Sequence, residues 1–126
     1  MSLVLDAGAL VAIERGDRDL IALIKRERGQ ERAPITHAGV VGQVWRGGHG
    51  RQAILARVLP GVEVVPLDDG LGRRSGVLLG QAATRDVIDA SVVLLARDGD
   101  DIYTSDPEDL RVLIEATGTH IELIPI

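Results

Sequence analysis

The most constraining feature of the sequence is a short apolar segment, Ser2–Leu5, that ends on the carboxylate of Asp6. A run this apolar predicts a β-strand covered on both faces, as in a parallel sheet packed between helices. In open sheets of this kind, ligands bind outside the carboxyl ends of the strands, which is where Asp6 would stand. Asp is also a common helix N-cap, so Asp6 taken alone indicates a structural role as readily as a functional one.

Apolar spacing and turn residues predict strands that alternate with helices along the rest of the chain. We expect strands at 33–35, 62–65, 102–104 and 121–124, and helices at about 9–14, 18–28, 36–45, 52–59, 68–83, 84–96 and 106–115. Thr36 and Thr84 are the expected N-caps of two of these helices, and Gly39 and Gly42 indicate a close neighbour in the first of them. The alternation predicts a three-layer α/β/α sandwich with a mostly parallel sheet of about five strands.

Composition supports a single domain over residues 1–126 and excludes some functions. The chain is 45% hydrophobic, which is enough for a substantial core, but it has no Phe, one Trp and one Tyr. Folds that bind single-stranded nucleic acid by base stacking need several exposed aromatic residues, so any contact with nucleic acid must be mainly through phosphate and sugar. A net charge of −5 argues against passive nucleic-acid binding. The absence of a basic leader and of a long apolar run predicts a soluble, cytoplasmic protein with no membrane segment.

Three further carboxylates are placed where they could join Asp6. Asp106 follows the predicted strand 102–104 directly, and it would open into the same crevice if that strand and the first flank the point where the strand order reverses. Asp86 and Asp89 are three residues apart, and therefore on one face of an apolar helix. Burying carboxylates there is costly unless a cation compensates them. Oxygen ligands without Cys and without a spaced His pair select Mg²⁺ or Mn²⁺ over Zn²⁺.

Each of these acids also has a structural explanation. Asp106 before Pro107 has the pattern of a helix N-cap with Pro at the first helical position. Asp86 lies in a first helical turn, where the helix dipole favours negative charge, and Asp89 could be paired with a buried Arg85. The three histidines, His37, His49 and His120, have no ligand spacing and are expected to be solvated or structural.

Three segments, 5–10, 86–90 and 103–110, resemble in that order the acidic motifs of PIN-domain ribonucleases, and most closely those of VapC-type toxins from bacterial toxin–antitoxin pairs. The resemblance covers the whole chain in length and in motif order. It implies a parallel sheet with helices on both sides, Mg²⁺- or Mn²⁺-dependent cleavage of RNA, a homodimer, and inhibition by a cognate antitoxin.

The resemblance also assigns residues to the site. Asp6 matches the first acid of the family, Asp89 the third and Asp106 the fourth, and Asp86 is an accessory acid. The second acid is usually a Glu in a setting like Glu-Val-Trp-Arg, and this chain has Gln43 in that place. The neutral amide removes one negative charge, which lowers the expected metal affinity and puts a second metal in doubt.

The expected mechanism follows from phosphodiester chemistry, in which a cation lowers the pKa of its bound water and stabilises the leaving oxygen. Asp6, Asp89 and Asp106 would hold the metal, Gln43 and Asp86 would position it or the attacking water, and Arg15 and Arg46 are candidate phosphate contacts.

Alternative functions are a catalytically weakened module that only binds antitoxin or RNA, a phospho-accepting signalling domain, and a phosphatase with an Asp nucleophile. The signalling domain would need a Lys late in the chain, but Lys25 is the only Lys. The phosphatase would need an acid two residues after Asp6, where Gly8 stands.

Overall fold

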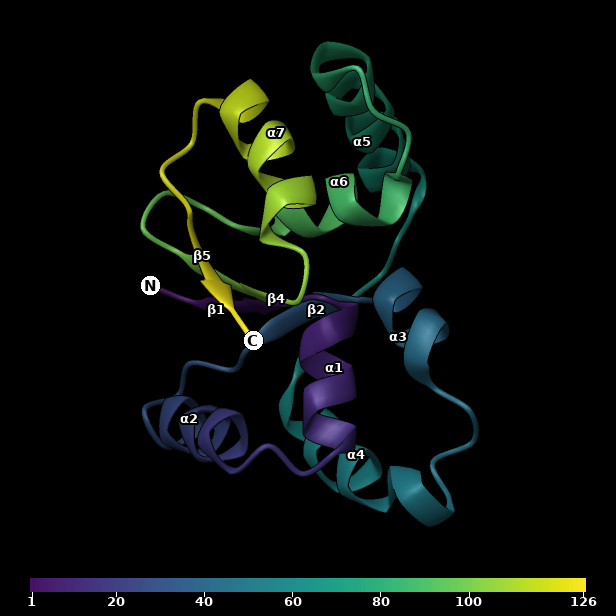
Figure 1. Ribbon diagram of the computed structural model, residues 1–126, viewed down its shortest axis with the longest axis vertical. Coiled ribbons are helices and arrows are strands. Elements are labelled where there is room, and N and C mark those ends of the chain that lie inside the picture. The colour runs from purple at the N-terminus through teal and green to yellow at the C-terminus, as the bar shows by residue number, and fades with distance from the viewer.

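Strand β1 (Leu3–Leu5) is the central strand of a five-stranded sheet in the computed structural model, which describes residues 1–126 (Figure 1). The strand order is β3-β2-β1-β4-β5, and every neighbouring pair is parallel. The remaining strands are β2 (Ile35–His37), β3 (Glu63–Val65), β4 (Asp101–Thr104) and β5 (Glu122–Pro125). The α/β class, the parallel direction and the strand number expected from the sequence are confirmed.

Seven α-helices connect the strands, because parallel neighbours need a crossover between them. They are α1 (Ala7–Glu14), α2 (Arg18–Gly29), α3 (Ala38–Val44), α4 (Ala53–Val58), α5 (Asp69–Ala82), α6 (Val87–Leu95) and α7 (Pro107–Thr117). Short 3₁₀ turns, η1 (Gly50–Gln52) and η2 (Leu59–Gly61), flank α4. None of these helices has both the length and the apolar character needed to cross a lipid bilayer.

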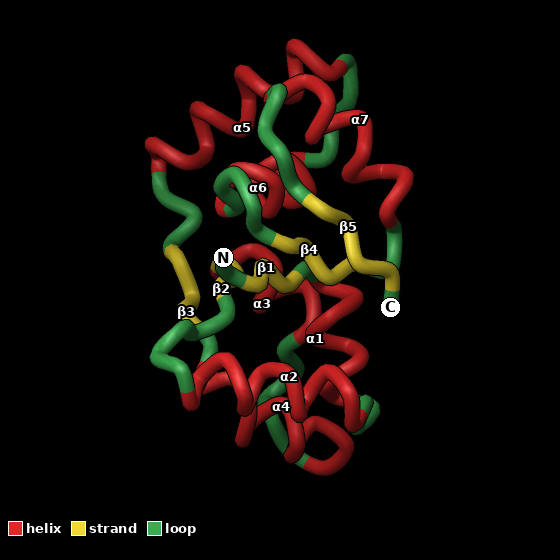
Figure 2. The backbone as a smooth tube through the Cα atoms, turned by 90° about the vertical axis from the view of Figure 1, so that its left-hand side faces the viewer, coloured by secondary structure: helices red, strands yellow, loops and turns green.

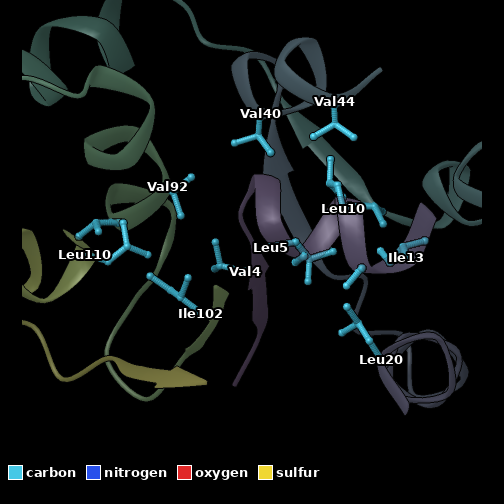
Figure 3. Close-up of a cluster of buried hydrophobic side chains, with 14 of the residues drawn as sticks. Val4, Leu5, Leu10, Ile13, Leu20, Val40, Val44, Val92, Ile102 and Leu110 are labelled. Carbon is cyan, nitrogen blue, oxygen red and sulfur yellow. The ribbon is translucent and has the colours of Figure 1, made fainter. Parts of the chain in front are cut away.

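The helices form two layers with the sheet between them. Helices α5, α6 and α7 pack against one another on one face, and α1 packs with α2, α3 and α4 on the other (Figures 1 and 2). Side chains of β1 supply both layers because successive residues of a strand point to opposite faces. Val4 lies beside Val92 and Ile102, whereas Leu5 lies beside Leu10 and Ile13 (Figure 3). The central strand is therefore buried on both sides, as its apolar sequence predicts.

Two predicted helix N-caps are wrong. Thr36 lies inside β2, one residue before the cap of α3, and its hydroxyl donates a 2.8 Å hydrogen bond to the Leu5 carbonyl of β1. His37 caps α3 instead. Thr84 precedes α6 by three residues, and the cap of that helix is Asp86, whose carboxylate accepts from two backbone N–H groups.

The two glycines of α3 differ in their surroundings. A Cβ on Gly39 would meet Ile88 Cδ1 at 2.6 Å and the His37 ring at 2.9 Å, so the expected close neighbour is present there. A Cβ on Gly42 would meet nothing within 4 Å, so the same expectation is wrong for Gly42.

Candidate active site at the carboxyl edge of the sheet

The strand order reverses between β1 and β4. From β1 the sheet continues through β2 and β3 on one side and through β4 and β5 on the other. Asp6 directly follows β1, and Asp106 follows β4 after one intervening residue. Because all strands are parallel, these two carboxylates lie at the same edge, where open sheets of this kind bind ligands.

Asp6 is both a helix cap and part of a group of acids. Its carboxylate is only 8% exposed and accepts a 2.9 Å hydrogen bond from the Ala9 N–H at the start of α1. Burial raises the pKa of Asp6, and the negative charge of Asp106 raises it further. Hydrogen bonds from the Thr104 hydroxyl and from the Ala9 and Gly8 N–H groups act in the opposite direction. The capping explanation is therefore correct, and Asp6 is at the same time close enough to Asp106 for that charge to raise its pKa.

Asp89 is the most perturbed carboxyl group of the site. Burial and then the negative charges of four other acids raise its pKa to about 6; in decreasing order of effect these acids are Asp86, Asp109, Asp6 and Asp106. The only ion pairs in the structure are Arg32–Glu27, Arg73–Asp69 and Arg111–Glu108, so none of these five acids has a cationic partner. The expected alternative, a buried pair with Arg85, is absent.

Asp106 begins α7, but its side chain makes no capping hydrogen bond. Its backbone N–H donates to the Thr104 hydroxyl at 2.9 Å, which fixes the turn after β4. Gly8 lets this turn approach α1, because a Cβ there would lie 2.2 Å from Ser105 Oγ. The Asp106 carboxylate is therefore exposed, held close to Asp6, and free to bind something else.

Asp86 is the cap of α6. One of its oxygens accepts from the Ile88 and Asp89 N–H groups, each at 3.0 Å, which explains an acid at this position without a ligand. Its negative charge nevertheless has the largest effect of the four acids that raise the pKa of Asp89.

The remaining predicted site residues form no hydrogen bond or ion pair with these acids. Gln43 is exposed on α3 and makes no side-chain hydrogen bond. Arg46 folds back on the end of the same helix, where its guanidinium donates to the Gly42 carbonyl at 3.1 Å and the Trp45 carbonyl at 2.7 Å. Arg15 is exposed, has no ion pair, and lines a cavity of about 590 Å³ together with Gly8 and Ser105.

Two residues of the site were not identified from the sequence. Thr104 is fully buried and connects the Asp6 carboxylate to the Asp106 backbone, but a Thr inside a strand carries no distinctive signal. Asp109 lies in the first turn of α7, where an acid is favoured by the helix dipole and so gives no separate sign of function, but its charge contributes to the raised pKa of Asp89.

All potential ligands in this crevice are carboxylate or hydroxyl oxygens, which suits a hard divalent cation. No three His, Asp or Glu side chains of the structure lie together as a ready-made group of direct metal ligands. Mg²⁺ retains several of its waters, so carboxylates too far apart to coordinate it together can still bind it through those waters. The donor set therefore fits a hydrated divalent ion better than a dehydrated one.

The sequence matches no protein-family model and no curated protein. The fold is similar to that of a chain in the crystal structure of VapBC2 from Rickettsia felis bound to a DNA fragment from its promoter. The similarity has a TM-score of 0.70 and covers 98% of this chain and 99% of that one, at 12% sequence identity. It establishes a PIN-like α/β/α fold over the full length.

Proposed function

We propose that this chain is a Mg²⁺- or Mn²⁺-dependent endoribonuclease that hydrolyses phosphodiester bonds in RNA. The observation that carries the proposal is the environment of Asp89: burial, followed by the negative charges of four other carboxylates, raises its pKa, and no cationic side chain forms an ion pair with any of these acids. Carboxylates that lie close together without a cationic partner destabilise the folded protein. A bound cation would turn their mutual repulsion into favourable binding energy. Strongly perturbed carboxyl groups in a crevice are typical of functional sites.

In this proposal Asp6, Asp89 and Asp106 hold the ion, directly or through its waters. Asp86 orients the first turn of α6 and adds negative charge beside Asp89. When bound, the ion supplies a water of lowered pKa and stabilises charge on the leaving oxygen. Thr104 lies at both segments: its hydroxyl accepts a hydrogen bond from the Asp106 N–H, and it acts to lower the pKa of Asp6.

We assign substrate contacts to arginine side chains that have no hydrogen-bond or ion-pair partner within the protein. Arg15 has no ion-pair partner and lines the same cavity as Gly8 and Ser105. These two residues lie shortly after Asp6 and directly before Asp106 in the chain, so we assign Arg15 to the RNA phosphates. Arg46 is already bonded to two carbonyl groups of its own helix end and has fewer donors left for the same role. Gln43, one amide in place of the usual Glu, would order a water or the ion only weakly.

Similarity in fold to a chain of a VapBC2 complex supports a toxin that pairs with a cognate antitoxin. We further propose that the antitoxin inhibits it and that it acts in the cytoplasm as a homodimer. In the absence of antitoxin, light scattering at micromolar concentration should give twice the chain mass of 13.4 kDa. A strict monomer would remove the dimer from the proposal and leave the nuclease untouched.

A second candidate is a PIN-like module that binds antitoxin or RNA without cleaving it. Gln43, and the absence of a ready-made ligand group, favour this candidate. The two candidates differ in whether Mn²⁺ restores cleavage of RNA by protein first treated with a chelator. We expect cleavage that is absent with chelator and returns with Mn²⁺; if RNA stays intact at every Mn²⁺ concentration while it still binds the protein, the module is correct.

A further inference from the structure

Two consecutive residues at the end of β2, Thr36 and His37, connect separate parts of the acidic crevice. Both are completely buried, with 0% of each side chain exposed. The Thr36 hydroxyl donates to the carbonyl of Leu5, the residue before Asp6, at 2.8 Å. The His37 Nε2 lies 3.3 Å from the carbonyl of Ile88, the residue before Asp89.

The hydrogen bonds of His37 define its protonation state. Nδ1 accepts a 3.0 Å hydrogen bond from the Gly39 N–H, so this nitrogen carries no proton. The Ile88 carbonyl can only accept, so Nε2 must carry the proton and donate. The ring is therefore the neutral Nε2–H tautomer, in agreement with the lowered pKa that burial gives His37.

The start of α3 is also tightly packed against the first turn of α6. Gly39 lies so close to Ile88 that any side chain there would overlap Ile88 Cδ1 at 2.6 Å. The start of α3 and the first turn of α6 are therefore in direct contact, in addition to being hydrogen-bonded through His37. Because neighbouring strand residues point to opposite faces of a sheet, Thr36 and His37 reach β1 and α6 from one short segment.

We infer that Thr36 and His37 are positioning residues that together set the separation between Asp6 and Asp89. Neither side chain forms a hydrogen bond with an acid; each is hydrogen-bonded to the backbone carbonyl of the residue that precedes one. The consequence for catalysis rests on the proposed function, whereas the hydrogen bond between His37 of β2 and Ile88 of α6 does not. Displacing a catalytic group by about 1 Å costs on the order of 100-fold in rate, so such links have measurable effects.

His37 offers a pair of substitutions that separate positioning from helix capping. The His37→Asn side chain places an oxygen near the position of Nδ1 and is itself a good N-cap, but it is too short to reach Ile88. The His37→Gln side chain places an amide nitrogen near the position of Nε2 and can still donate to Ile88. If His37 serves only to cap α3, the Asn variant should be the better one; if it positions α6, the Gln variant should be.

Thr36 offers a parallel pair. Thr36→Val keeps the shape and loses the hydroxyl, and Thr36→Ser keeps the hydroxyl. Ser75→Ala is the matched control. It removes a buried hydroxyl of α5 that is hydrogen-bonded at 2.8 Å to Ser91 of α6, so it weakens the α5–α6 contact and leaves the contact between β2 and α6 intact. The experiment measures thermal stability, the affinity for Mn²⁺ alone by calorimetry, and kcat and KM for RNA cleavage.

We expect His37→Asn and Thr36→Val to lose about 10-fold to 100-fold in kcat with KM within about 2-fold, and to bind Mn²⁺ more weakly. His37→Gln and Thr36→Ser should stay within about 3-fold of the wild type, and Ser75→Ala should lose stability without losing kcat. The inference is overturned if His37→Asn is as active as His37→Gln, or if kcat simply follows thermal stability across all five variants.

The two proposals fail separately. If the wild type neither binds Mn²⁺ nor cleaves RNA, the nuclease is wrong, and positioning is then read from amide hydrogen exchange of Asp89 and Ala90 in the metal-free protein. Faster exchange at these amides in His37→Asn than in His37→Gln supports the link, and equal exchange overturns it.

Discussion

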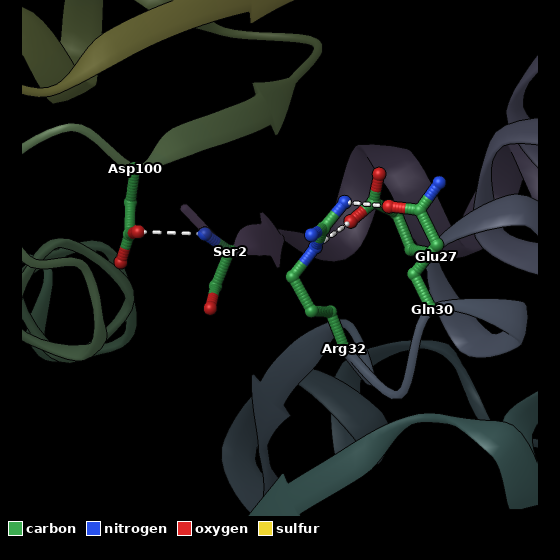
Figure 4. Close-up of polar contacts among 5 residues, drawn as sticks. All are labelled: Ser2, Glu27, Gln30, Arg32 and Asp100. Atoms are coloured by element: carbon green, nitrogen blue, oxygen red, sulfur yellow. Dashed lines mark hydrogen bonds and ion pairs between the residues drawn. The ribbon is translucent and has the colours of Figure 1, made fainter.

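Buried carboxylates at the two ends of the sheet differ in which polar and charged groups lie around them. At the amino end, Asp100 is 6% exposed, and its two oxygens accept from the Ser2 N–H at 2.7 Å and the Arg97 N–H at 2.8 Å. Glu27, equally buried, pairs with Arg32 at 2.9 Å, and that partner holds the pKa of Glu27 below its usual value (Figure 4). At the carboxyl end, the pKa values of Asp6 and Asp89 are raised, and no cation lies against either.

Burial alone does not explain this difference. Asp6 and Asp100 are buried to nearly the same extent, at 8% and 6% exposure. Asp101, also at the amino end, has a raised pKa as well, but it has only Asp100 and Glu122 as acidic neighbours, whereas Asp89 has four. Asp100 and Glu27 at the amino end each have their own donors or cationic partner. The acids at the carboxyl end lie near one another and have no cationic partner. This contrast is what a binding site for a cation requires.

The largest expected effect is on activity at the carboxyl end. Asp6→Asn should lower RNA cleavage by about 1000-fold, because losing one metal ligand removes several kcal/mol of transition-state stabilisation. The fold should survive, since the Asn side-chain oxygen still accepts from the Ala9 N–H. Single-turnover cleavage of RNA in Mn²⁺ measures the effect. Asp6→Asn protein that cuts as fast as the wild type would show that the contrast between the two ends has no catalytic meaning.

The matching substitution at the amino end should affect stability instead. Asp100→Asn keeps one acceptor oxygen but turns an amide NH₂ toward the second backbone N–H donor, which costs about 2 kcal/mol. Urea denaturation measures the loss, and cleavage by the folded protein should stay within about 2-fold of the wild type. If Asp100→Asn is as stable as the wild type, the hydrogen bonds at the amino end do not stabilise the fold as described.

The smallest effect is a gain of stability at the carboxyl end. Since the folded-state pKa of Asp89 is about 6 and its ordinary value is 3.8, the folded state binds more protons between these values, and its stability falls as pH rises through that range. Asp89→Asn should therefore stabilise the metal-free protein by about 1 kcal/mol at about pH 7.5, a figure reduced for the solvent that reaches this half-buried group.

The gain from Asp89→Asn should shrink to nothing below about pH 4, where the wild-type carboxyl is protonated in both states. Thermal or urea unfolding at a series of pH values in the presence of chelator gives this difference directly. A variant less stable than the wild type at about pH 7.5 would mean that Asp89 has a favourable partner in the folded protein.

The sequence predicted the ends of β1 and β4 well, but it placed the end of β2 two residues too early and two helix caps wrongly, for a physical reason. Asp6 and Asp106 could be placed because an apolar strand followed by an acid is a local pattern, and parallel strands bring their carboxyl ends to one edge. Thr36 and His37 are both able to cap α3, and the choice depends on a tertiary contact, since the Thr36 hydroxyl is bonded to Leu5 across the sheet.

The surroundings of the acids could not be derived from the sequence either. Asp89 has no ion pair with Arg85, although the two are close in the sequence, and its acidic neighbours Asp6, Asp106 and Asp109 come from other elements. Both features depend on how distant elements pack together. Arg46 was a reasonable candidate for phosphate binding until the structure showed it bonded to the end of its own helix.

Calorimetric titration of Mn²⁺ into the metal-free protein tests the central claim most directly, because it needs neither RNA nor an antitoxin. The account predicts binding by the wild type that releases protons at about pH 6, where the Asp89 carboxyl is half protonated, and at least a 10-fold loss of affinity in Asp89→Asn. Binding that is absent from the wild type, or unchanged when Asp89 is neutralised, would contradict the proposal that these acids share one cation.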